Sequence, residues 1–305
     1  MNQTEALTRP PENKWLILAA WLSLLLISDL PDIVWTYLSG PLPPWLAGAK
    51  TAAIAAFLLL CLAWSALRPL WRFALVMLVF CLALRLSAWV REAAWFQDRF
   101  LGPSPSFSTG YLGVYILDLG VAAGVIAALW LVKRHRREFF LVKGQPGAPI
   151  GPVRWLGIRP GQSWRTFGWI FAGVAGLGVL IPTALEVQPS LDLLGRAWPL
   201  LPFVLLFAAV NAFTEEVYFR LSLLATLTDI VGKNHALLLN VVFFGLAHYL
   251  HGSPPGIMGF LMTGFLAWLL GKSILETRGL LWAWFIHFVP DVVIFAFYAI
   301  LYVKA

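Results

Sequence analysis

The chain has 305 residues, of which 60% are hydrophobic and only 12% are charged, and its formal net charge at pH 7 is +7. Soluble domains carry about 25% charged residues, so this composition excludes a secreted enzyme, a nucleic-acid-binding domain and a protein with one membrane anchor. At about 20 residues per crossing, the hydrophobic content allows about nine helices. The sequence therefore predicts an all-α, polytopic transmembrane helical bundle with eight or nine helices.

Hydrophobic stretches bounded by Pro, Gly and charged residues predict the helices in chain order. Four are expected before a long connection, at residues 15–31, 46–66, 70–90 and 111–132. Five are expected after it, at residues 166–185, 198–227, 235–250, 256–272 and 279–302. No small-residue cleavage site follows the first stretch, so we interpret it as a transmembrane helix rather than a signal peptide.

The connection divides the chain into a four-helix membrane region at 1–132, a basic segment at 133–165 and a five-helix core at 166–305. The basic segment begins with Lys133-Arg134-His135-Arg136-Arg137. Because Lys and Arg collect in cytoplasmic loops, their distribution predicts a cytoplasmic N-terminus and a cytoplasmic connection. We interpret the connection as a topology determinant that touches anionic lipid head groups, with substrate docking as the alternative.

Ionisable side chains inside a bilayer are costly, so each is expected to have a partner or a function. The N-terminal helices hold only Lys50, Arg85 and Asp118, and we expect Asp118 to neutralise one of the two cations. In contrast, three helices between Asn211 and Asp291 hold many polar residues. This concentration makes the C-terminal core the candidate site.

Spacing assigns the acidic residues of the first of these helices to different partners. Glu216 and Arg220 are an i,i+4 pair with the acid first, the favourable order for an ion pair within a helix. Glu215 points about 100° around the helix, toward the face of Asn211, and has no obvious cation. A desolvated carboxylate without a cation is suited to general-base catalysis.

The other two helices add histidines. His248 follows Phe244 by one turn, and His287 and Asp291 are an i,i+4 pair on the last helix. The helix lengths predict that four ionisable side chains meet near the middle of the membrane: Glu215, His248, His287 and Asp291.

This set of residues suits the activation of water against a carbonyl group. Glu215 would take a proton from water, and the histidines with Asp291 would orient the water or stabilise the oxyanion. A second interpretation places a divalent metal, zinc, on His248, His287 and Glu215. The His-Glu-x-x-His signature of many zinc enzymes is absent from the sequence. Both interpretations predict a hydrolase.

Three motifs in order resemble those of the CPBP intramembrane proteases, which include Rce1-type CAAX prenyl endopeptidases and bacterial Abi relatives. They are Glu215-Glu216-x-x-x-Arg220, Phe244-x-x-x-His248 and His287-x-x-x-Asp291. The resemblance covers roughly Arg154 to Tyr302. It implies an intramembrane endopeptidase of a bacterial or archaeal plasma membrane that cleaves membrane-anchored peptide or protein substrates.

The resemblance also implies roles for individual residues. Glu215 is the catalytic glutamate, Glu216 and Arg220 are its supporting pair, and His248 and His287 position water or stabilise the oxyanion. Asp291 occupies a position that is commonly Asn in the family, and it is counted with the catalytic residues. Phe244 and Asn211 are counted as supporting residues. A glutamate-type enzyme requires no cofactor, whereas the metal-dependent version requires zinc.

Other classes of function stay open at the level of sequence. The polar cluster is also compatible with a non-enzymatic membrane immunity or binding protein on the same fold, and with a proton-coupled transporter. The intact Glu215, His248 and His287 disfavour the former, and the absence of an inverted repeat disfavours the latter. The lipid bilayer is an expected partner in every case, and nucleic acid is not.

Overall fold

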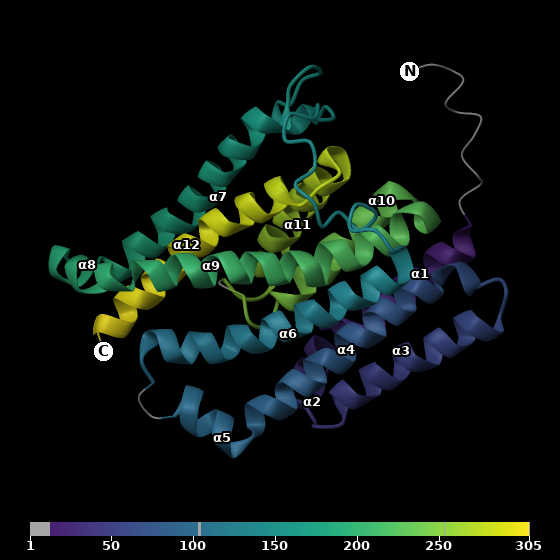
Figure 1. Cartoon of the computed structure of the whole chain (residues 1–305), viewed down its shortest axis with the longest axis horizontal. Helices are drawn as coiled ribbons and strands as arrows, with labels where there is room; N and C mark the ends of the chain where they lie inside the picture. The colour runs from purple at the N-terminus through teal and green to yellow at the C-terminus, as the bar shows by residue number, and fades with distance from the viewer. Residues whose placement is uncertain (1–12, 103–104, 253, 305) are drawn as a thin grey trace. The chain divides into compact units, whose positions relative to one another are not determined.

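The computed structural model describes residues 13–102, 105–252 and 254–304, and these are almost entirely helical (Figure 1). The helices of the N-terminal part are α1 (Lys14–Ile27), α2 (Leu30–Ser39), α3 (Leu46–Ala63), α4 (Trp71–Glu92), α5 (Ala94–Phe96) and α6 (Phe107–Lys133). Those of the C-terminal part are α7 (Trp164–Val187), α8 (Leu191–Ala197), α9 (Leu201–Glu215), α10 (Ser222–Ala247), α11 (Ile257–Thr277) and α12 (Leu281–Lys304). The predicted all-α polytopic bundle is confirmed.

Among the described residues, seven helical stretches are long and apolar enough to cross a membrane, or eight if the bent pair α1 and α2 is one span. The longest stretch, 191–247, contains two of the predicted helices, and Gly232 breaks it with a φ of 82°. Glycine tolerates this left-handed conformation because it has no Cβ. The break falls within the predicted loop between residues 227 and 235.

The first predicted helix, 15–31, is wrong in its extent. The chain forms α1 and α2 instead, which meet at a bend of 51°. Pro31 lies in the first turn of α2. A proline at this point cannot donate a backbone hydrogen bond to the preceding helix and its ring crowds the carbonyl one turn earlier, so α1 ends before it.

Contacts divide the chain into two packing units. The first unit comprises residues 1–82 and 222–268, and the second comprises residues 83–221 and 269–305. The three segments expected from the sequence, at 1–132, 133–165 and 166–305, remain a prediction about organisation along the chain.

In the first unit, α1 packs against α3 and α10. Lys50 of α3 lies at the bend between α1 and α2, where it forms an ion pair with Asp32 and donates a hydrogen bond to the carbonyl of Ser28 at 3.2 Å. Its Nζ also lies 3.8 Å from Oδ1 of Asp29. Two nearby acids therefore neutralise Lys50, and the pairing of Asp118 with Arg85, the other cation considered, stays a prediction.

In the second unit, α12 packs along α7 and α9, and α9 also packs against α6 (Figure 1). Aromatic side chains from α6, α9 and α12 form much of the buried core here, including Phe107, Tyr115, Phe207 and Phe295. This core fixes the positions of α9 and α12, the two helices that carry most of the candidate site.

The basic connection is ordered against the turn between α11 and α12. The backbone N–H of Gln145 donates to the carbonyl of Thr277, and that of Leu280 donates to the carbonyl of Val142, both at 2.8 Å. The indole of Trp282 donates to the carbonyl of Pro146 at 2.9 Å. These bonds hold the connection to the start of the helix that carries His287.

Candidate active site

Glu215 and Glu216 lie where the helix changes its winding. The α-helix α9 ends at Glu215, and a π-helical segment follows over Glu216–Leu221. π-Helical turns inside α-helices are rare and occur frequently at functional sites. At this change of winding, the consecutive carboxylates of Glu215 and Glu216 both lie near the side chain of His287.

Glu216 and Arg220 form the predicted ion pair. Nη1 of Arg220 lies 3.5 Å from Oε1 of Glu216, and neither side chain has any exposed surface. Buried charges are stable only with such compensation. The i,i+4 prediction for this pair is confirmed.

His287 of α12 lies between the two glutamates. Its Nδ1–H donates to Oε1 of Glu216 at 2.9 Å, and its Nε2 lies 3.5 Å from Oε2 of Glu215. Nε2 is also 3.9 Å from Oδ2 of Asp291, one turn further along α12. The contact between Glu216 and His287 is absent from the sequence analysis, which paired Glu216 with Arg220 alone.

Asn211 connects the two remaining carboxylates. Its Nδ2 donates to Oε1 of Glu215 at 3.3 Å and to Oδ2 of Asp291 at 3.0 Å. Its Oδ1 accepts a hydrogen bond from the hydroxyl of Tyr115 at 3.1 Å. The predicted common face of Asn211 and Glu215 is confirmed, and Tyr115 is an addition from α6 that sequence reasoning missed.

A second contact joins α6 to the same segment, since the hydroxyl of Tyr218 donates to the backbone carbonyl of Asp118. Tyr115 and Asp118 are three residues apart on α6, so both contacts come from one face of that helix. The spacing of Tyr111, Tyr115 and Asp118 on one face of the largely apolar α6 is the signal that could have identified this face.

His248 belongs to the first unit, as does Phe244. Nδ1 of His248 lies 3.0 Å from the carbonyl of Phe244, and the two rings are 4.3 Å apart. Because a carbonyl can only accept, Nδ1 of His248 carries a hydrogen. α10 ends at Ala247, so His248 begins the following turn rather than lying inside the predicted helix 235–250. The meeting of His248 with Glu215 stays a prediction.

The histidine and carboxylate side chains of this site are also candidate metal ligands. Among the described residues, no group of three or more His, Cys, Asp or Glu side chains is arranged to hold a metal ion. Both ring nitrogens of His287 face carboxylates. The zinc ligands expected from the sequence, His248, His287 and Glu215, therefore stay a prediction that metal analysis must test.

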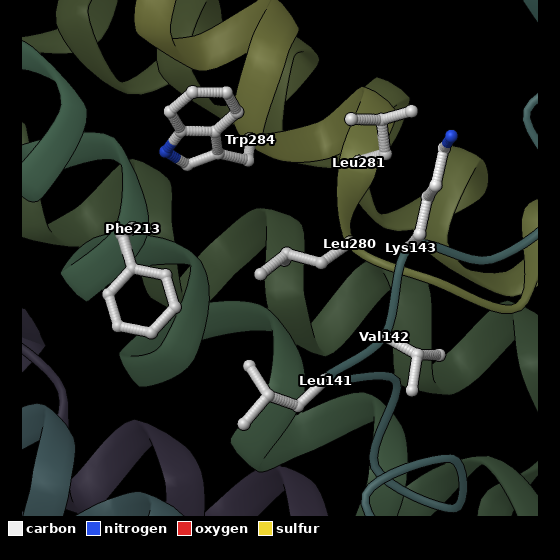
Figure 2. A pocket seen from close by; sticks show the side chains of 7 residues that line it. All are labelled: Leu141, Val142, Lys143, Phe213, Leu280, Leu281 and Trp284. Atoms are coloured by element: carbon white, nitrogen blue, oxygen red, sulfur yellow. The ribbon is translucent and has the colours of Figure 1, made fainter.

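An apolar pocket of about 280 Å³ is bordered by the end of α9, the start of α12 and the connection (Figure 2). Phe213 and Trp284 border it, two residues before Glu215 and three before His287. The indole of Trp284 donates to the carbonyl of Ala209 at 3.0 Å, which fixes this wall. The remaining lining residues come from the connection and the start of α12: Leu141, Val142, Lys143, Leu280 and Leu281. Lys143 supplies the one cationic side chain among these lining residues.

Residues 197–293 match the family model described as "Type II CAAX prenyl endopeptidase Rce1-like". The matched segment contains all eight candidate site residues predicted from the sequence, and it excludes Tyr115 and the connection. Neither a curated protein nor a solved structure matches the chain significantly. Together, the apolar helices, the motifs and this match identify an integral multi-pass membrane protein whose residues 197–293 are similar to the Rce1-like domain of the CPBP intramembrane proteases.

Proposed function

We propose that the protein is an intramembrane endopeptidase in which Glu215 activates water to hydrolyse a peptide bond of a membrane-anchored peptide or protein. The observation that carries this proposal is the position of His287 between Glu215 and Glu216. A buried carboxylate–imidazole–carboxylate arrangement can accept a proton and pass it on without bulk water.

The proposed hydrolysis moves one proton from water to the leaving amine. Glu215 takes one proton from water while the water oxygen bonds to the carbonyl carbon of the substrate. When the C–N bond breaks, the leaving amine receives that proton, carried by Glu215 or through Nε2 of His287, which lies 3.5 Å from Oε2 of Glu215. His248 is proposed to orient the water or stabilise the oxyanion.

Asp291 has a different proposed role from a neutral Asn at the same position. An ionised carboxylate accepts hydrogen bonds and cannot donate one to an oxyanion. Its Oδ2 accepts a hydrogen bond from Asn211 at 3.0 Å. We therefore propose that Asp291 orients Asn211 and lies beside Nε2 of His287. Stabilisation of the oxyanion is assigned to the histidines.

The pocket supports a proposal for the substrate. Leu281 lies six residues before His287, about 9 Å along α12 at 1.5 Å per residue. An extended peptide covers that distance with about three residues. We propose that substrates end about three residues beyond the scissile bond, with an apolar side chain in the pocket and the terminal carboxylate near Lys143. This agrees with the CAAX substrates in the description of the family.

The proposed topology places the N-terminus and the connection on the cytoplasmic side, as the basic residues indicate. Substrate tails would then reach the pocket from the cytoplasm. Cysteines introduced at Arg134 and at Asp192 would lie on opposite sides of the membrane in this topology. Labelling each with a membrane-impermeant thiol reagent tests the assignment.

The deciding experiment is cleavage by purified protein in phosphatidylcholine–phosphatidylglycerol vesicles. The probes are peptides with a farnesylated or palmitoylated cysteine followed by three residues, and mass spectrometry detects the products. Wild type is compared with Glu215→Gln and with the control Glu186→Gln, an exposed residue of α7. We expect cleavage by wild type and the control only.

If none of the peptides is cleaved, membrane peptides from cells that express wild type or Glu215→Gln are compared in the same way. Identical peptide profiles would reject proteolysis and favour a non-enzymatic immunity or binding protein. Loss of activity after chelation, with recovery on adding zinc, would select the metal-dependent mechanism over the glutamate type.

A further inference from the structure

We propose that Tyr115 is a positioning residue of this active site, supplied by the N-terminal region outside the family match. The inference rests on the proposed function. The hydroxyl of Tyr115 fixes which end of the Asn211 amide faces the catalytic carboxylates.

The two ends of the Asn211 side chain differ in their hydrogen-bonding chemistry. A carboxamide presents an oxygen that accepts and a nitrogen that donates, and the two ends have nearly the same shape. Nδ2 faces Glu215 and Asp291, at 3.3 Å and 3.0 Å. A half-turn of the amide would instead place Oδ1 against two acceptors. The orientation with Nδ2 toward the acids is the one that makes both hydrogen bonds.

Tyr115 selects the same orientation from the other side. Its hydroxyl donates to Oδ1 of Asn211 at 3.1 Å. After a half-turn of the amide, the hydroxyl would face an NH2 group, and the phenol would have to act as acceptor instead. Tyr115 therefore favours the donating orientation toward Glu215, which restrains the carboxylate that must receive a proton from water.

The Tyr115 ring is itself held in place. Only 7% of the residue is exposed. Its ring stacks on Phe207 of α9, with centroids 5.6 Å apart and planes at 19°, and meets Phe295 of α12 edge-on at 5.8 Å. Aromatic packing of this kind restrains the ring and leaves rotation of the hydroxyl hydrogen as the main freedom.

The contact between Tyr218 and Asp118 supports the same function for α6. It ties α6 to the π-helical segment directly after Glu216. α6 thus contacts the site segment both before and after the two glutamates. A helix that lies outside residues 197–293 thereby determines the geometry within them.

The test compares Tyr115→Phe with the matched control Tyr111→Phe, in the vesicle assay described above. Both changes remove one hydroxyl from the same face of α6, and Tyr111 also packs on Phe207 and Phe295. We expect Tyr115→Phe to lower kcat about tenfold, which corresponds to about 1.4 kcal/mol. KM and the melting temperature should stay close to those of the control.

A double-mutant cycle with Asn211→Ala separates positioning from a general loss of packing. We expect Tyr115→Phe to change kcat less than twofold when Asn211 is absent. The proposal is overturned if Tyr115→Phe retains turnover within twofold of wild type, if its melting temperature falls in step with activity, or if the same tenfold loss persists in the Asn211→Ala background. Equal cleavage by wild type and Glu215→Gln would instead reject the proposed function itself.

Discussion

The Nδ1–H of His287 donates to Oε1 of Glu216 at 2.9 Å, the same oxygen that lies 3.5 Å from Nη1 of Arg220. One carboxylate oxygen thus serves both the guanidinium that neutralises it and the imidazole that it orients. Because the donor is Nδ1, the other ring nitrogen faces Glu215. Glu216 therefore connects the charge balance of Arg220 to the orientation of the His287 imidazole.

Glu216→Gln tests this double role. The amide can still accept one hydrogen bond, but the change removes the carboxylate charge that lies 3.5 Å from the buried guanidinium of Arg220. Removing one partner of a buried pair costs about 3 to 5 kcal/mol, so we expect a loss of that size in the free energy of unfolding. Equilibrium unfolding in mixed micelles measures it. Glu92→Gln, at an exposed position on α4, serves as the control. Equal stabilities of the two variants would contradict the role of the pair.

His287→Ala should reduce cleavage by at least about 100-fold, the scale at which positioned acid–base groups contribute. His135→Ala, at an exposed position in the connection, should leave the rate unchanged. Product formation in the vesicle assay measures both rates. A rate for His287→Ala within tenfold of wild type would show that proton transfer does not depend on the imidazole.

Lys143→Gln should weaken the binding of substrates that carry a free terminal carboxylate. We expect KM to rise up to about fivefold for a peptide acid, since an exposed charge-assisted contact contributes up to about 1 kcal/mol. The same peptide with a C-terminal amide should show no change between wild type and variant. An equal effect on acid and amide would mean that Lys143 does not recognise the carboxylate.

Leu281→Trp should obstruct the pocket without touching the catalytic residues. The larger side chain occupies space between Phe213, Trp284 and the connection. We expect substrates with a large apolar C-terminal residue to lose more cleavage than substrates ending in alanine. Competition between the two peptides in one reaction, followed by mass spectrometry, reports the ratio directly. A uniform loss across both peptides would argue against a side-chain pocket.

Gly279→Ala tests the attachment of the connection. An added Cβ at Gly279 would lie 2.3 Å from the backbone nitrogen of Gly144, so one of the two backbones must move. We expect a loss of about 2 kcal/mol or more in stability, since strain of this kind is not relieved by a rotamer change. Gly120→Ala on α6, where nothing lies within 4 Å, is the matched control and should stabilise the protein by up to about 1 kcal/mol. Thermal unfolding of both variants provides the comparison.

Sequence patterns predicted the helices well where hydrophobic stretches end at clear breaks. α3, α4, α7 and α12 lie within a few residues of their predicted bounds. The polar residues and Pro31 at 28–32 indicate a loop after the first helix, whereas the chain bends by 51° there and continues as α2, because proline is accepted in the first turn of a helix. The short helix α8 was missed because seven residues are too few for a hydrophobic pattern.

The site was predictable where its contacts are local. The pairs Glu216–Arg220 and Asn211–Glu215 follow from i,i+4 spacing, and both were confirmed. The contacts of His287 with Glu216 and of Tyr115 with Asn211 join residues 71 and 96 positions apart. No local spacing rule encodes such pairs, because they depend on how α6, α9 and α12 pack.

The division into packing units has a consequence for dissection of the protein. The chain passes from one unit to the other at residues 82, 221 and 268, so the family-matched segment 197–293 includes parts of both and all of neither. A fragment limited to that segment would leave the α6-facing side of α9 and the α7-facing side of α12 uncovered. The smallest fragment that folds is therefore expected to be larger than residues 197–293, and removal of the first four helices should destabilise the fold.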